Sequence, residues 1–205
     1  MRLLERAVAE DGLFRSVHLL QDGRQAGDYL PGARFHTSPL ERIVGRGNAV
    51  PERRRAQRRD WWTAARQAVA GCRVVFLDPD NGLRPRSVRD GYIDEPKYCR
   101  RCEVVDLIGR HDLIVVYQHA QQSVPWATLR STIVASVRED LRAAGLTEAA
   151  QTPVHTLVAS TFGRRGFICF ARTPSLADEA RTAIEALIGR AGGGPLDGKL
   201  WVESD

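Results

Sequence analysis

The chain has 205 residues, of which 43% are hydrophobic and 27% are charged, and its formal net charge is +5. This length and balance predict a globular domain with a core of its own, and they exclude a disordered or collagen-like chain. No apolar run reaches the roughly 20 residues that a membrane-spanning helix needs, so we expect no membrane partner.

The first 50 residues give the weakest structural signal. Residues 1–10 predict a short helix that carries an acid and lacks the long apolar core of a signal peptide, so we expect a cytoplasmic protein. Residues 13–20 predict a strand. The segment 21–50 is rich in Gly, Pro and Asp and has no clear periodicity, so the sequence does not determine whether it is ordered.

The positive charge comes from arginine, because lysine occurs only at Lys97 and Lys199. It is densest in a helix predicted from Pro51 to about Val69. This helix carries Arg53, Arg54, Arg55, Arg58 and Arg59, followed by Trp61 and Trp62. Guanidinium groups fork onto phosphates and indoles stack on bases, so the run suits a nucleic acid or nucleotide, with Arg54, Arg55 and Arg58 binding the substrate. The alternative is a solvated helix face in a protein that uses arginine throughout.

The centre of the chain predicts a βαβ unit. Residues 73–77 form a short apolar run, which indicates a strand buried on both faces. A helix follows over 95–108 with Asp94 as its N-cap, and residues 112–117 predict a second buried strand. Another helix begins near Ser123 and Pro125 and stops at Gly145.

The last 50 residues predict an antiparallel hairpin, with strands at 154–160 and 167–171, followed by a helix from 174 to about 188. A glycine-rich link at 192–194 leads to a possible edge strand at 199–202. We expect one α/β domain over residues 1–205, a Rossmann-like three-layer sandwich whose sheet is mostly parallel and ends in the hairpin.

Polar side chains follow both strands of the βαβ unit. Asp78, Asp80 and Asn81 follow the first strand, and Gln118 and His119 follow the second. Because open α/β sheets bind ligands at the carboxyl ends of their parallel strands, we expect a site there. Lys97, in the first turn of the intervening helix, faces the same edge. The competing interpretation is that Asp-Pro-Asp-Asn-Gly is only a favourable turn sequence.

The four cysteines give no metal or redox signal of comparable strength. Cys99 and Cys102 form a lone CxxC pair inside the predicted helix, whereas a structural zinc site normally needs two such pairs or partnering histidines. Cys72 and Cys169 fall in apolar segments. We therefore expect all four to be structural.

Two resemblances involve these motifs. The FLDPDNGL segment, Pro96-Lys97-Tyr98 and the Val116–His119 segment resemble a family of uncharacterised bacterial proteins that carry DPDNG, KY and YQH elements in that order, which implies no activity. Asp78-Pro79-Asp80-Asn81 is similar, in its first two positions, to the Asp/Asn-Pro-Pro-aromatic motif of class I methyltransferases that modify adenine. That resemblance implies that Asp78 holds the amino group to be methylated and that S-adenosylmethionine is the cofactor. Asp22–Asp28 is the only candidate for its glycine-rich turn.

Three functions follow from these patterns. The first is a methyltransferase-like domain that acts on nucleic acid or a nucleotide. The second is a divalent-metal-dependent nuclease or phosphoesterase in which Asp78 and Asp80 bind Mg²⁺, Lys97 stabilises developing charge and His119 transfers a proton. The third is a non-catalytic domain that binds nucleic acid or a protein. This function would be indicated by an Asp78 carboxylate that only caps its own turn. The sequence does not determine the substrate or the oligomeric state.

Overall fold

The computed structural model describes residues 34, 36, 40, 43–45, 49–85, 87–121, 123–160, 163–194 and 196–205. The helix expected at 1–10, the strand at 13–20 and the possible glycine-rich turn at 22–28 lie outside the described residues. Within them, no helix is long and apolar enough to cross a membrane.

Helices and strands alternate along most of the described chain. The helices are α4 (Ala49–Ala68), the 3₁₀ turn η1 (Glu95–Lys97), α5 (Arg101–Ile108), α6 (Trp126–Ala143), α7 (Thr147–Gln151) and α8 (Pro174–Ala191). The strands are β1 (Val74–Leu77), β2 (Leu113–His119), β3 (His155–Ala159), β4 (Arg165–Ala171) and β5 (Leu200–Ser204). The strands predicted at 73–77 and 112–117, the helices predicted from 51, from about 125 and from 174, the hairpin and the C-terminal edge strand are thus confirmed to within a few residues.

The five strands form one mixed sheet in the order β1-β2-β4-β3-β5. Only β1 and β2 are parallel, whereas β2–β4, β4–β3 and β3–β5 are antiparallel. The expectation of a mostly parallel sheet is therefore wrong. The reason for this difference is that β4, the second strand of the hairpin, pairs with β2 at seven positions. The hairpin therefore forms the middle of the sheet.

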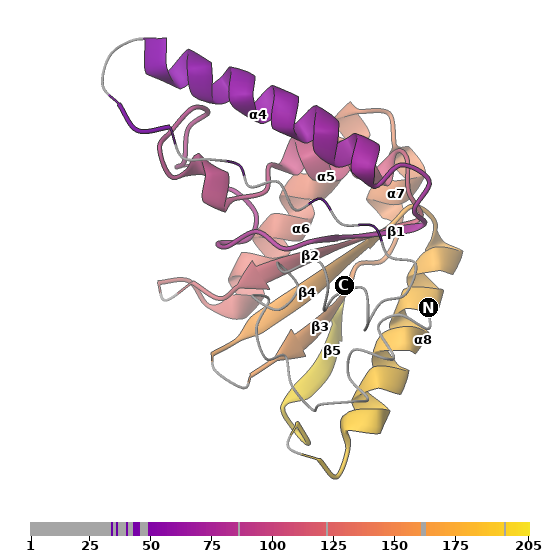
Figure 1. The fold of residues 1–205 in the computed structure, drawn as a ribbon. Helices are drawn as coiled ribbons and strands as arrows, with labels where there is room; N and C mark the ends of the chain where they lie inside the picture. Colours follow the sequence, from indigo (N-terminus) through magenta and orange to yellow (C-terminus); the bar gives the residue numbers. More distant parts are fainter. Residues whose placement is uncertain are drawn as a thin grey trace.

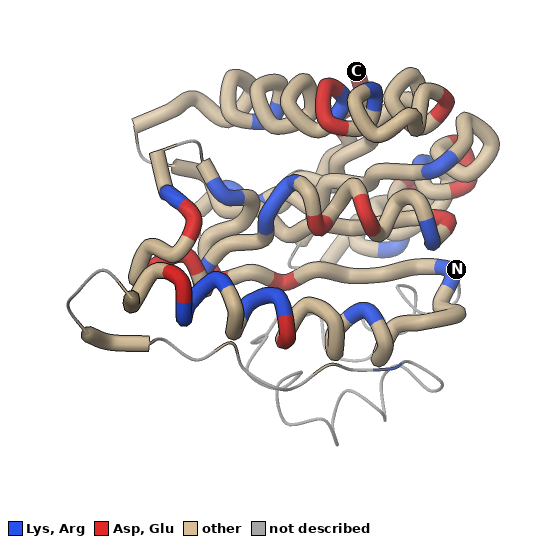
Figure 2. Tube along the Cα trace, turned by 90° about the horizontal axis from the view of Figure 1, so that it is seen from above, with Lys and Arg blue, Asp and Glu red and all other residues tan. Residues whose placement is uncertain are grey.

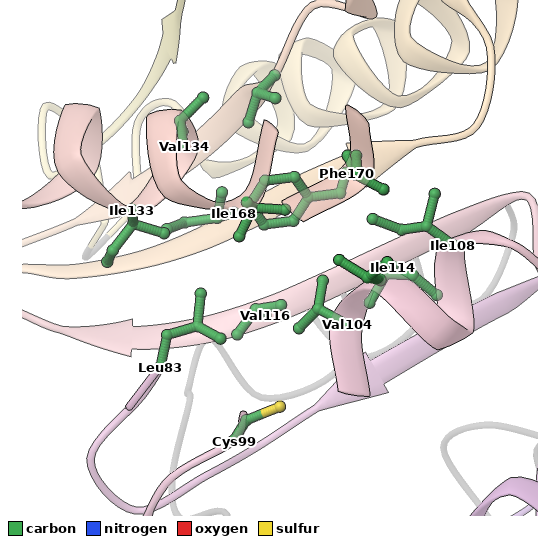
Figure 3. Close-up of a cluster of buried hydrophobic side chains, with 14 of the residues drawn as sticks. Leu83, Cys99, Val104, Ile108, Ile114, Val116, Ile133, Val134, Ile168 and Phe170 are labelled. Carbon is green, nitrogen blue, oxygen red and sulfur yellow. The ribbon is translucent and has the colours of Figure 1, made fainter. Parts of the chain in front are cut away.

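Helices cover both faces of the sheet, so the molecule has three layers (Figure 1). On one face, α4, α5, α6 and α7 enclose the larger core, in which side chains such as Val104, Ile108, Ile114, Val116 and Ile168 are fully buried (Figure 3). On the other face, α8 packs through Ile184 and Leu187 on β2, β3, β4 and β5. This smaller helical layer leaves Val74 and Phe76 of β1 exposed, at 45% and 46%.

The helix predicted over 95–108 is interrupted, which corrects the sequence prediction. The 3₁₀ turn η1 ends at Lys97, Tyr98 is extended, and Cys99 forms a parallel bridge with Leu83 before α5 begins at Arg101. Asp94 precedes η1, but its side chain makes no capping hydrogen bond to this turn. The Glu103 side chain instead accepts from the backbone N–H of Arg100 at 2.8 Å and closes a capping box at the start of α5.

Candidate functional site

The carboxyl ends of β1 and β2 meet at one edge of the sheet, as the sequence predicted. The two strands are parallel and Leu77 pairs with Val116, so Asp78 emerges beside Tyr117. Side chains alternate between the two faces of a strand, which places Asp78 and His119 on the face that α8 partly covers. The Tyr117 and His119 rings lie 4.7 Å apart in an edge-to-face arrangement.

The loop after Asp78 is held in place by Gln118 of β2. The backbone N–H of Leu83 donates to Gln118 Oε1 at 2.8 Å, and Gln118 Nε2 donates to the backbone carbonyl of His119 at 3.0 Å. Gly82 has a φ of +81°, and a Cβ at this position would lie 2.3 Å from Gln118 Oε1. Because Gln118 is completely buried, it positions the loop and does not reach the surface where a substrate would bind.

Lys97 contributes to the same loop through its backbone. Its carbonyl accepts a hydrogen bond from the backbone N–H of Asn81 at 2.9 Å. Its ammonium group lies 3.6 Å from the Asp94 carboxylate, and both side chains are partly exposed. The Asn81 residue is exposed at the tip of the loop. The structure therefore brings Asn81 and Lys97 together but pairs the lysine charge with Asp94.

Asp78 and Asp80 are the two acids of this edge. Desolvation by the surrounding protein, and then repulsion from Asp80, raise the pKa of Asp78 from 3.8 to about 6. Among the described residues, neither carboxylate has a hydrogen-bond or ion-pair partner. The sign expected for a non-catalytic turn, an Asp78 carboxylate used to cap its own loop, is therefore not observed in that part of the chain.

Arg165 is a residue of this edge that the sequence analysis missed. It is the first residue of β4 and pairs with His119 across the sheet. Desolvation and the positive charge of Arg165 lower the pKa of His119, whereas Asp80 raises it. The pKa of His119 thus depends on charges from two neighbouring segments, and its lowering favours the neutral imidazole near pH 7. The available signal was the Arg164-Arg165 pair in the turn of a predicted hairpin.

Arg54 and Arg58 of α4 donate hydrogen bonds to other groups of the same protein. Arg58 is 4% exposed, and its Nε and one terminal nitrogen donate to Glu103 at 2.8 and 2.7 Å. The same guanidinium also donates to the backbone carbonyls of Glu95 and Tyr98. Arg54 donates to the backbone carbonyls of residues 43 and 91, at 2.9 and 3.0 Å.

Two other arginines of α4, Arg55 and Arg59, are paired with an acid of the same helix. Arg55 forms an ion pair with Glu52 at 3.0 Å, one turn back on the same helix. Figure 2 shows basic and acidic residues interspersed along the helices. Arg54, Arg55 and Arg58 therefore attach α4 to its surroundings, and Arg58 is too deeply buried to reach a substrate phosphate.

A shallow cavity lies away from the Asp78 edge, beside the last turn of α4. Its lining includes Thr63, Arg66, Gln67, Arg110 and His111. His111 Nδ1 lies 2.7 Å from the backbone carbonyl of Cys72, so the imidazole holds the chain before β1. None of the predicted site residues lines this cavity.

Within the described ranges, no group of three or more His, Cys, Asp or Glu side chains comes together as a metal site. The Cys99 thiol is buried, and desolvation raises its pKa well above the usual value. No family model, curated protein or solved structure matches the chain. The case for a function therefore depends on the chemistry of the Asp78 edge.

We expect the raised pKa of Asp78 to appear as a pH-dependent loss of stability. Between pH 3.8 and about 6 the folded state retains a proton that the unfolded state has released, so the free energy of unfolding falls as pH rises through this window. Asp78→Asn should therefore raise the thermal midpoint at pH 8 and leave it nearly unchanged at pH 3.5.

The matched control for that experiment is Asp60→Asn, which alters an exposed acid on α4. It should change the midpoint equally little at both pH values. An Asp78→Asn protein that is destabilised at pH 8 would show that the carboxylate is satisfied in the folded state, against the geometry described above.

Proposed function

We propose that this protein is a methyltransferase-like domain that acts on an amino group of a nucleic acid or nucleotide at the Asp78 edge. The observation that carries the proposal is the Asp78 carboxylate itself. It follows directly on a parallel strand, lies on the same sheet face as His119 and Arg165, and has no partner within the described chain. Asp78 is exposed, and an accessible acceptor in that place suits an amine donor of a bound base.

The arrangement of the strands supports the same proposal. A parallel pair, β1 and β2, is continued by an antiparallel hairpin whose second strand lies next to β2. This is similar to the end of the class I methyltransferase sheet. Asp78 then occupies the strand end at which that resemblance puts the amine-binding acid.

Phe76 provides an aromatic surface near the acid. It is 46% exposed and lies two residues before Asp78, on the same face of β1. Its ring stacks against that of Phe167 with centroids 6.2 Å apart. Because a base can stack on such a ring, Phe76 takes the role of the aromatic residue that the Asp78–Asn81 motif lacks.

Each group then has a defined part in the reaction. Asp78 accepts a hydrogen bond from the amine and orients it, and neutral His119 is available to take up a proton. S-adenosylmethionine would supply the methyl group to the amine nitrogen and leave as S-adenosylhomocysteine, and the amine would lose one proton. The described residues contain the acceptor side of the site but no glycine-rich turn for this cofactor, since the only candidate, residues 22–28, lies outside them.

The test is transfer of labelled methyl groups from S-adenosylmethionine to single-stranded DNA, single-stranded RNA and free nucleotides. We expect the intact chain to label at least one of these acceptors and the Asp78→Ala variant to label none above background. If the intact chain labels no acceptor in any of the three mixtures, the proposal is wrong.

A divalent-metal-dependent nuclease or phosphoesterase is the second candidate, and one observation favours it. Desolvation first and the charge of Asp80 second raise the pKa of Asp78, and a hard cation between the two carboxylates would relieve their repulsion. Carboxylate oxygens are the ligands that Mg²⁺ prefers, and two of them with bound water are sufficient to hold it. Strand cleavage in the same mixtures that requires Mg²⁺ or Mn²⁺ would support this function in place of methyl transfer.

A further inference from the structure

Most arginines of the described chain are engaged by their own protein. The ion-pair partners of Arg66, Arg73, Arg100, Arg101 and Arg138 are carboxylates within 4 Å, and Arg54, Arg55, Arg58 and Arg59 of α4 are engaged as described above. Unengaged guanidinium groups are therefore informative in this molecule, because the fold has not used them for its own stability.

Arg165 is such a group, and its position distinguishes it from the others. It is half-buried, and within the described chain it has neither a hydrogen-bond nor an ion-pair partner. A partly desolvated guanidinium without a partner is unfavourable, since its donors lose water without gaining an acceptor. A bound anion would supply those acceptors.

The sheet fixes where this anion would lie. Arg165 pairs with His119, and Phe167 of the same strand pairs with Tyr117, their rings 5.3 Å apart. Neighbouring strands are about 4.8 Å apart, so β4 and β1 lie about 10 Å from each other with β2 between them. Arg165 thus lies beside His119 and Asp78 beside Tyr117, on one face of one edge.

A second cation lies at the same strand end. The guanidinium of Arg164 is held over the ring of Trp201, 5.5 Å from its centroid. Arg164 has no carboxylate partner within the described residues. Side-chain alternation directs Arg164 to the opposite face from Arg165, so it adds positive potential at the rim but does not face Asp78.

We propose that Arg165 binds a phosphate group of the substrate, so that the reacting base lies at Asp78 and its phosphate lies at the start of β4. A planar guanidinium forks onto phosphate oxygens with two parallel hydrogen bonds, which matches the chemistry of a nucleotide. This inference rests on the proposed function for the kind of ligand, and it moves the phosphate contact from α4 to the hairpin.

The experiment is fluorescence anisotropy of a labelled 15-residue oligodeoxyadenylate, whose bases carry an exocyclic amine, at several salt concentrations and without methyl donor or metal ion. For a single strand the slope of log affinity against log salt is about −0.7 per phosphate contact. Arg165→Ala should weaken binding at least 10-fold and make the slope shallower by about 0.7. Arg165→Lys should keep the slope and weaken binding less, because charge is retained and the fork is lost.

The control is Arg142→Ala, which removes an exposed arginine in the last turn of α6 and causes the same change in net charge. It should leave both affinity and slope unchanged. Competition with adenosine monophosphate and with inorganic phosphate separates the sources of the phosphate. Displacement by the nucleotide alone indicates a nucleotide site, and displacement by neither indicates a strand-specific site.

The inference would be overturned if the intact chain and Arg165→Ala gave the same slope of log affinity against log salt. It would also be overturned if the intact chain bound neither the oligonucleotide nor the mononucleotide. Failure of the proposed function gives a different result. In that case binding still depends on Arg165, and the intact chain transfers no methyl group from S-adenosylmethionine.

Discussion

Asp78→Ala is expected to reduce methyl transfer at least about 100-fold, whereas Asp78→Asn should retain a substantial part of it. A positioned acid–base or hydrogen-bonding group typically contributes a factor of about 10² to 10⁴ to a rate. The asparagine side chain keeps a carbonyl oxygen that can accept from the amine, and the alanine side chain keeps none. The two variants are compared in the labelled methyl assay at pH 7.5.

The same pair of variants separates the two candidate functions. A neutral amide is a poor ligand for Mg²⁺ beside a carboxylate, so a metal-dependent cleavage would be lost in Asp78→Asn as completely as in Asp78→Ala. Asp60→Ala, on the exposed side of α4, is the control for a lost acid and should leave either activity intact. Full methyl transfer by Asp78→Ala would contradict the assignment of this residue.

The second large effect is expected at the buried ion pair between α4 and α5. Arg58 and Glu103 are 4% and 5% exposed at their side chains, and the pair is closed by two hydrogen bonds. Removing one member leaves the other charge buried and uncompensated, which costs about 3–5 kcal/mol. Glu103→Leu should therefore lower the free energy of urea-induced unfolding by that amount.

Two further variants show that the cause is the unpaired charge. The double variant Arg58→Met, Glu103→Leu should recover part of the loss, because it removes both charges and keeps apolar volume. Arg59→Ala disrupts a pair with Glu52 in which the side chains are 62% and 61% exposed, so it should change stability by less than about 1 kcal/mol. A Glu103→Leu protein as stable as the intact chain would show that Arg58 is solvated.

The sequence predicted the elements of this fold better than their arrangement. The apolar runs at β1 and β2, the spacing of α6 and the hairpin turn are local signals, and the structure confirms each of them. The place of β4 between β2 and β3 is not local. It depends on pairing β4 with residues about 50 positions earlier, where Gly166 leaves room for the Trp126 ring and β2 offers a free edge.

The site residues also divide into those that local signals predicted and those that depend on contacts between distant parts of the chain. The meeting of Asp78 with Tyr117 and His119 follows from parallel strands and was predicted. The role of Arg58 was not, because its partner Glu103 lies 45 residues away and the interrupted helix at Tyr98 brings it into reach. Arg165 was missed for the same reason as the sheet order, since its neighbour His119 becomes visible only when β4 pairs with β2.

The most direct test of the proposed function is the thermal midpoint of the intact chain in increasing concentrations of S-adenosylmethionine. A ligand that binds only the folded state adds about 2.7 kcal/mol of stability at 100 times its dissociation constant. We predict a saturable rise of the midpoint with S-adenosylmethionine that Mg²⁺ at the same concentrations does not reproduce. No rise at millimolar S-adenosylmethionine would contradict the account.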